Sequence, residues 1–336
     1  MNQIRQTKIL GVGGYVPENK ITNFDLEKMM DTTNDWIVQR TGIETRYWAN
    51  DETSTSDLAL EASLEAIKNS SIKKEDIDFI LVSSCSGDAD FPGVSCFLQA
   101  KLGLATIPAL EIKQQCSGFV YGLTLADSLI KSGLYNNILL VGAELQSKGL
   151  DKTSRGRNTS VLFGDGAGAF VLTGHTEADG PRIIASDLHA DGNFAEELWI
   201  PAPGCGLGPS RMTQEIFDQG LHFPVMNGKT VFVHAVKRMS ETVREVLSKS
   251  GMSIQDIDLF LFHQANLRIN QKVGEMLELK DEQVHNTVQK FGNTTAATIP
   301  LGFKDAMEAG KIKRGQKMIF AAFGSGFTWG SVLLEY

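Results

Sequence analysis

Apolar residues along this chain follow two alternating patterns, helical spacing and short continuous runs. Apolar spacing from Ser56 onward predicts an amphipathic helix, and the apolar run within Asp76–Ser83 predicts a buried strand. The same order returns later, where a predicted helix over Val231–Ser250 precedes the run Asp256–Phe262. That second run repeats the Asp-Ile-Asp-apolar pattern of the first at an offset of 180 residues. The pattern therefore indicates an internal duplication.

The repeat extends to the chemistry-bearing segments of both halves. Cys116–Gly133 and Asn293–Gly310 are equally long, which predicts that Asn293 is the counterpart of Cys116. Each segment precedes a predicted strand, and each half closes on Phe-Gly and a further apolar strand: Ile138–Val141 and Phe163–Leu172 in one half, Met318–Ala321 and Phe323–Leu334 in the other. We expect two similar α/β units, residues 1–174 and 175–336, packed about a pseudo-twofold axis. The alternative is that the two halves are similar only because helices, turns and strands alternate in any α/β protein.

A Gly- and Pro-rich stretch, Asp187–Lys229, separates the repeated segments and is expected to be an irregular excursion. With 42% apolar residues the chain can bury a large core, and its net charge of -8 without a Lys/Arg block argues against nucleic-acid binding. Four cysteines without paired spacing argue against a structural zinc site or a disulfide scaffold. With no signal-peptide core and no membrane-length apolar run, a cytoplasmic protein without membrane partners is expected.

Three polar or reactive side chains follow predicted strands. Cys116 lies where a strand hands over to a helix, and exposed amides and the helix dipole there favour a thiolate. His263 follows the strand that ends at Phe262, and Asn293 precedes the second helix. Taken singly, a free cysteine is often a small buried hydrophobe, and an asparagine is often a turn or cap residue. Because strand ends of such sheets converge on one crevice, we expect the three to meet.

The chain resembles a β-ketoacyl-acyl carrier protein synthase III, a member of the thiolase-like condensing enzymes. The resemblance covers nearly the whole chain and rests on Cys116, on His-Gln-Ala-Asn-Leu-Arg at 263–268, on Gly-Asn-Thr at 292–294 and on Phe323–Ser331. It implies an α/β, thiolase-like five-layered α-β-α-β-α fold made of two duplicated halves, and a homodimer. It implies no metal and no cofactor, since acyl-CoA and malonyl-acyl carrier protein are substrates.

The resemblance also implies a mechanism that suits these residue types. Cys116 would take an acyl group from acyl-CoA, with the first oxyanion held by the backbone amides of Cys116 and Ser325. His263 and Asn293 would then donate hydrogen bonds to the malonyl thioester oxygen during decarboxylation. The product would be a 3-oxoacyl-acyl carrier protein that initiates fatty acid synthesis, with acetyl-CoA as the expected primer.

Binding residues follow from the same resemblance. Trp36 and Arg155 would stack on the adenine of CoA, and Thr32 and Arg40 would add lesser contacts. The carrier protein would bind the segment Gln264, Ala265, Asn266, Leu267 and Arg268. Phe323 would line the acyl pocket, and Phe91 would reach into that of the neighbouring subunit. A buried tryptophan, a solvated arginine and a packed phenylalanine are the ordinary alternatives.

The sequence departs from the family pattern at several points, and these leave the primer open. Gln114 and Gln115 stand before the cysteine where many relatives carry small apolar residues, and Ser325 interrupts the usual three glycines. A related ketosynthase or acyltransferase of a specialised pathway, using a longer or functionalised acyl-CoA, is the alternative. A thiolase would carry a second cysteine near the C-terminus, and a non-catalytic partner would have no need of Cys116.

Overall fold

Two β-sheets form the frame of this computed structural model, which describes residues 5–177, 179–208 and 210–336. The first sheet has the strand order β1-β7-β6-β4-β5, and the second has the order β11-β12-β13-β8. Their strands are β1 (Gln6–Tyr15), β4 (Phe79–Ser83), β5 (Ala109–Ile112), β6 (Asn137–Glu144), β7 (Gly166–His175), β8 (Arg182–Ala190), β11 (Leu259–Phe262), β12 (Lys317–Gly324) and β13 (Thr328–Glu335). The sheets are mixed: β4 pairs in parallel with β5 and β6, and β11 with β12, while the remaining pairs are antiparallel.

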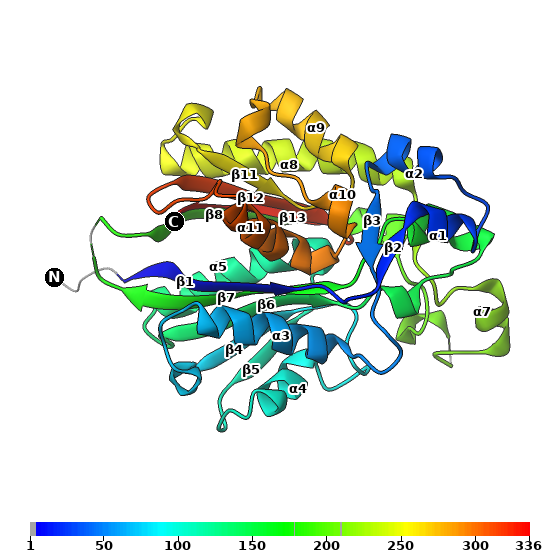
Figure 1. Ribbon diagram of the computed structural model, residues 1–336, viewed down its shortest axis with the longest axis horizontal. Helices are drawn as coiled ribbons and strands as arrows, with labels where there is room; N and C mark the ends of the chain where they lie inside the picture. The colour runs from blue at the N-terminus through cyan, green and yellow to red at the C-terminus, as the bar shows by residue number, and fades with distance from the viewer. Residues whose placement is uncertain (1–4, 178, 209) are drawn as a thin grey trace.

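Helices cover both sheets and fill the space between them (Figure 1). Two helices, α5 (Gly118–Lys131) and α11 (Thr298–Glu308), lie between the sheets. The helices α3 (Thr55–Lys68) and α4 (Val94–Lys101) cover the outer face of the first sheet, and α8 (Gly228–Ser250) and α9 (Leu267–Met276) cover that of the second. The predicted five-layered α-β-α-β-α fold is confirmed.

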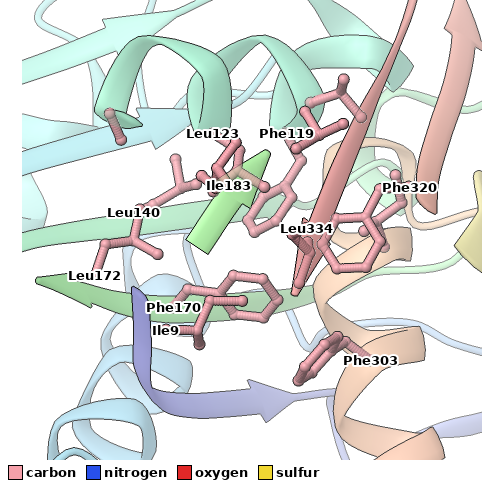
Figure 2. Close-up of a cluster of buried hydrophobic side chains, with 14 of the residues drawn as sticks. Ile9, Phe119, Leu123, Leu140, Phe170, Leu172, Ile183, Phe303, Phe320 and Leu334 are labelled. Atoms are coloured by element: carbon pink, nitrogen blue, oxygen red, sulfur yellow. The ribbon is translucent and has the colours of Figure 1, made fainter. Parts of the chain in front are cut away.

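Alternation along the central strands explains why these layers form. In β4, Phe79 and Leu81 face the helices between the sheets, while Ile80 and Val82 face α3 and α4. Both faces of the strand are buried, so its sequence is a continuous apolar run. The shared core between the sheets includes an aromatic group around Phe170, whose ring lies edge-on to that of Phe119 (Figure 2).

The second half repeats this alternation in the same phase. Leu259 and Leu261 of β11 face the shared core, and Phe260 and Phe262 face α8 and α9. The counterpart of β5 is reduced to one parallel bridge between Phe260 and Val284. The duplicated pattern therefore places both halves on a common core.

The predicted equivalence of Cys116 and Asn293 is wrong. Each inner helix is preceded by a 3₁₀ turn, η2 (Gln115–Ser117) before α5 and η9 (Thr295–Ala297) before α11. Counted from these turns, the counterpart of Cys116 is Ala296. Segments of equal length that end at the glycines after the helices do not begin at equivalent positions, because α5 has 14 residues where α11 has 11, a difference of about one helical turn.

The Asp187–Lys229 excursion is more regular than expected, since its first residues belong to β8 and it contains a short helix. A cap formed by β2 (Lys20–Thr22), α1 (Asn23–Glu27), α2 (Asn34–Thr41) and β3 (Thr45–Tyr47) lies at the right of Figure 1. The remaining helices and strands are α6 (Arg157–Ser160), β9 (Leu198–Trp199), α7 (Gln214–Gln219), β10 (Val225–Met226) and α10 (Val288–Phe291). Within the described ranges, none of the helices is long and apolar enough to cross a membrane. The boundary between residues 174 and 175 remains a prediction.

Candidate active site

A cavity of about 550 Å³ contains all three side chains that the sequence singled out for chemistry. Cys116, His263 and Asn293 line it, and each of them is buried. Exposed residues, among them Arg40 and Arg268, line the same cavity, so it runs from the surface to the buried trio. The expected convergence of the three side chains is therefore observed.

Cys116 lies in the 3₁₀ turn directly before α5, as the strand-to-helix pattern predicted. Burial raises the pKa of its thiol to about 12, and the neighbouring Glu144 adds to that rise. A thiol with this pKa is protonated at physiological pH, contrary to the expected thiolate. Gly324 packs against it so closely that a Cβ there would lie 2.8 Å from the Cβ of Cys116.

His263 is held at the end of β11 by its own backbone and by one side-chain contact. Its N–H donates to the Ala321 carbonyl at 2.8 Å, and its Nδ1 lies 2.7 Å from the hydroxyl oxygen of Thr298. The other ring nitrogen, Nε2, is buried without a hydrogen-bond partner among the described residues. Burial lowers the pKa of His263 to about 3, so the ring is neutral at physiological pH.

Asn293 has its side-chain amide oriented by the turn that follows it. Its Oδ1 accepts the backbone N–H of Thr295 at 2.9 Å, which leaves the NH₂ group as the end available for another acceptor. Its backbone bridges to Phe163 of the first half, donating to Leu162 at 2.8 Å. The asparagine therefore offers a fixed donor from the second half.

At the outer end of the cavity two guanidinium groups lie over the ring of Trp36. The Arg40 guanidinium lies 4.5 Å from the ring centroid and that of Arg157 lies 4.8 Å from it. Arg155, the residue expected to pair with Trp36, instead forms an ion pair with Asp151 and lies 5.5 Å from the ring centroid of Phe223. Sequence reasoning missed Arg157, because two arginines stand two residues apart and only the local turn decides which one faces the indole.

The predicted carrier-binding segment divides into buried and accessible residues. Gln264 is 1% exposed, and its side-chain amide is hydrogen-bonded inside the protein. It accepts the backbone N–H of Thr287 at 2.9 Å and donates to the backbone carbonyl of Phe262 at 2.8 Å. Its assignment to carrier contact is therefore contradicted by burial. Ala265, Asn266 and Arg268 line the cavity, and Leu267 packs against the cap.

Other predicted residues lie as follows. Phe323 is buried and lines the cavity, whereas Phe91 is 81% exposed. Thr32 is half-buried, with a hydroxyl that has no partner among the described residues. Ser325 donates its hydroxyl to the Leu198 carbonyl, and the positive φ in this loop is at Gly326, so the serine causes no strain there.

A buried carboxyl near the nucleophile also escaped sequence reasoning. Glu144 ends β6, and it accepts from the Ser86 hydroxyl at 2.5 Å and from the side chain of Gln146 at 3.2 Å. Burial raises the pKa of this carboxyl to about 7. The signal was its position at a strand end, the same kind of position that identified His263.

Sequence comparisons with known proteins match this chain to a single enzyme family. Residues 110–192 match the family model 3-oxoacyl-[acyl-carrier-protein] synthase III, and residues 247–336 match the model of its C-terminal part. A beta-ketoacyl-[acyl-carrier-protein] synthase III of Caldanaerobacter subterraneus subsp. tengcongensis is 43% identical over 328 residues, covering 98% of this chain and 97% of that one.

Solved structures extend this likeness to three dimensions. The crystal structure of 3-oxoacyl-[acyl-carrier-protein] synthase III from Aquifex aeolicus superposes with a TM-score of 0.89 at 41% identity, covering 98% of this chain and all of that chain. A priming β-ketosynthase from the R1128 polyketide pathway superposes with a TM-score of 0.87 at 28% identity, covering all of this chain and 98% of that one.

The duplicated five-layered frame is that of a thiolase-like condensing enzyme, with its buried cysteine at the first inner helix. Two matching family models and relatives above 40% identity over nearly the full length narrow this class. The chain belongs to the β-ketoacyl-[acyl-carrier-protein] synthase III family.

Proposed function

We propose that this enzyme condenses an acyl-CoA primer with malonyl-acyl carrier protein, releasing carbon dioxide and giving the 3-oxoacyl-acyl carrier protein that initiates fatty acid synthesis. The observation that carries the proposal is the single cavity shared by a thiol, a neutral imidazole and a fixed amide. A nucleophile with two hydrogen-bond donors suits acyl transfer followed by decarboxylation.

In the first half-reaction the sulfur of Cys116 attacks the thioester carbonyl of acyl-CoA. The new carbon–sulfur bond replaces the bond to CoA, and the proton of the Cys116 thiol ends on the departing CoA thiol, so the exchange is balanced. The oxyanion is assigned to the backbone amides of Cys116 and Ser325. The close packing of Gly324, the residue directly before Ser325, on Cys116 supports this assignment.

In the second half-reaction His263 and Asn293 donate to the thioester oxygen of the malonyl group. Loss of carbon dioxide from the malonyl carboxylate leaves the electron pair on the α-carbon. The enolate attacks the acyl carbonyl carbon, the carbon–sulfur bond to Cys116 breaks, and the departing thiolate takes a proton from solvent. Decarboxylation generates the carbanion without a base, so a neutral His263 suits this step.

For CoA we propose stacking of the adenine with Trp36 and Arg157, with Arg40 as a further contact and Arg157 in place of Arg155. For the carrier protein we propose contact with the accessible part of the predicted segment. Arg268 is its exposed cation at the cavity, and an acidic carrier would be attracted to it. CoA and the carrier act here as substrates, so no separate cofactor is proposed.

We also propose a homodimer in which Phe91 enters the partner's acyl pocket. Phe91 is 81% exposed, so its ring is free to gain apolar burial against a second copy of the chain. Sedimentation of the purified protein tests this: wild type is expected to run as a dimer and Phe91→Asp to weaken it. A wild-type monomer at micromolar concentration would refute the proposal.

The decisive experiment presents the protein with a panel of acyl-CoAs and reads the mass added at Cys116. We expect one added acyl group, with acetyl as the preferred primer, and none on Cys116→Ala. Malonyl-acyl carrier protein should then discharge the adduct as a 3-oxoacyl-carrier product. An adduct that still forms on Cys116→Ala would refute the nucleophile, and preference for a long or functionalised acyl group would favour the specialised alternative.

A further inference from the structure

Behind His263, on the side away from its free nitrogen, lies a hydroxyl that the reaction described above does not use. Thr298 is the first residue of α11 and is 2% exposed. Its Oγ1 lies 2.7 Å from His263 Nδ1 and 2.9 Å from the carbonyl oxygen of Thr295. A hydroxyl has one proton to donate, so it can serve only one of these two acceptors at a time.

The choice between the two acceptors determines what His263 presents to the cavity. If Thr298 donates to Thr295, then Nδ1 carries the imidazole proton, and Nε2 is a bare lone pair. If Thr298 donates to Nδ1, then Nε2 carries the proton and is a donor. Only the second arrangement allows a neutral His263 to hydrogen-bond a thioester oxygen.

One backbone contact and the proposed chemistry favour the second arrangement. The Thr295 carbonyl already accepts the backbone N–H of Thr298, so it remains satisfied without the hydroxyl. His263 Nδ1, in contrast, has Thr298 as its hydrogen-bond partner and no second one among the described residues. The 2.7 Å contact is made in either arrangement, because Nδ1–H could donate to the hydroxyl oxygen instead, and it is the donor role proposed for Nε2 that selects the second arrangement.

We propose that Thr298 is a positioning residue that donates its hydroxyl proton to His263 Nδ1 and thereby fixes the Nε2–H tautomer required for malonyl decarboxylation. The role rests on the proposed function of His263 as a donor. The neutral state of the buried ring makes the tautomer decisive, because an imidazolium would donate from both nitrogens whatever Thr298 did.

The same turn positions the other donor. The backbone N–H of Thr295 orients the side chain of Asn293, and Thr298 follows directly after the same 3₁₀ turn, Thr295–Ala297. Thr295 takes a left-handed φ of 51°, a conformation that a β-branched residue rarely adopts. One short turn therefore fixes the direction of the Asn293 amide and the placement of the Thr298 hydroxyl.

The tautomer itself can be measured without any activity. The wild-type protein is labelled with ¹⁵N-histidine, and the His263 signals are those that disappear in His263→Ala. At pH 7 we expect Nε2 in the protonated range and Nδ1 in the unprotonated range, with the pattern kept in Thr298→Ser. A protonated Nδ1 would overturn the inference, whether or not the enzyme condenses its substrates.

Kinetics of the separate half-reactions provide the second test. Thr298→Val keeps the side-chain shape but loses the hydroxyl, and we expect decarboxylation of malonyl-carrier protein by the acyl-enzyme to slow about 10- to 100-fold. Acylation of Cys116 and the KM for acyl-CoA should stay within about twofold of wild type. Thr298→Ser should restore decarboxylation.

The matched control is Thr124→Val, which removes a hydroxyl bonded at 3.0 Å to a backbone carbonyl within α5 and should leave both steps unchanged. Equal slowing of both half-reactions in Thr298→Val would mean a general structural role and would overturn the inference, as would wild-type decarboxylation. Failure of His263→Ala to impair decarboxylation would instead refute the donor role in the proposed function, leaving the measured tautomer as a separate result.

Discussion

Gly324→Ala offers a sharp test of how closely the C-terminal loop holds the nucleophile. A Cβ built at this position would lie 2.8 Å from the Cβ of Cys116 and 3.0 Å from its backbone nitrogen, where ordinary contacts are 3.4–4 Å. Relief of this overlap requires a displacement of about 1 Å between the two segments, in a core packed too densely to absorb it freely. Cys116 or the amide of Ser325 must therefore move.

The expected effect on chemistry exceeds the effect on stability. A misplacement of about 1 Å at reacting atoms costs about 100-fold in rate, so we expect acylation of Cys116 to slow by that factor. Overpacking of this size costs about 1–3 kcal/mol of unfolding free energy, which lowers the melting temperature by several degrees and leaves the enzyme folded at 25 °C.

The assay is rapid-quench mass spectrometry of the acyl adduct, with calorimetry on the same sample. Gly149→Ala is the matched control, because a Cβ at that exposed glycine meets nothing within 4 Å. Acylation of Gly324→Ala within about threefold of wild type would refute the reasoning, since the two segments would then tolerate the overlap.

Three further predictions concern the rest of the site. His263→Ala and Asn293→Ala should still form the acyl-enzyme but lose about 100-fold or more in malonyl decarboxylation, measured as released carbon dioxide; equal loss in both steps would count against the donor roles. Trp36→Ala and Arg157→Ala should raise the KM for acyl-CoA several-fold in steady-state assays, and Arg155→Ala should raise it less; the reverse order would restore Arg155 as the stacking residue. As the pH falls from about 6 to 4, the unfolding free energy of the wild type should decrease by about 1.4 kcal/mol per pH unit more than that of His263→Ala. The reason is that the histidine of the unfolded chain binds a proton near pH 6.5, whereas the buried one binds it only near pH 3. The measurement is urea denaturation of both proteins at a series of pH values, and unfolding free energies that change with pH in the same way in both would contradict this prediction.

The layers of the fold could be predicted from the sequence because the spacing of apolar residues shows which faces of each helix and strand are buried. Leu81 and Val82 face different helical layers, yet both are buried, and that produces the continuous apolar run that predicted a central strand. Convergence of Cys116 and His263 was predictable for a related reason, since both follow strands of the duplicated frame.

What the sequence could not supply depends on local geometry and on contacts between distant loops. Arg155 lies within a 3₁₀ turn (Ser154–Gly156), whereas Arg157 begins α6 directly after it, and spacing alone does not show which of them faces Trp36. Gln264 is buried because the loop at Thr287 donates to its amide, a contact across more than 20 residues that no spacing rule encodes. The tautomer of His263 likewise depends on Thr298, which lies 35 residues further along the chain.

The duplication explains why these roles are divided as they are. Gln115 and Thr295 are structural counterparts, and both take a left-handed φ, of 42° and 51°, before an inner helix. In the first half the next residue is Cys116, and in the second it is Ala296, which cannot react. The second half instead has Asn293 and Thr298 on either side of its turn, where one offers a donor and the other contacts His263. The repeated turn is therefore a common scaffold, on which one half carries the nucleophile and the other the hydrogen-bond donors that the proposed decarboxylation requires.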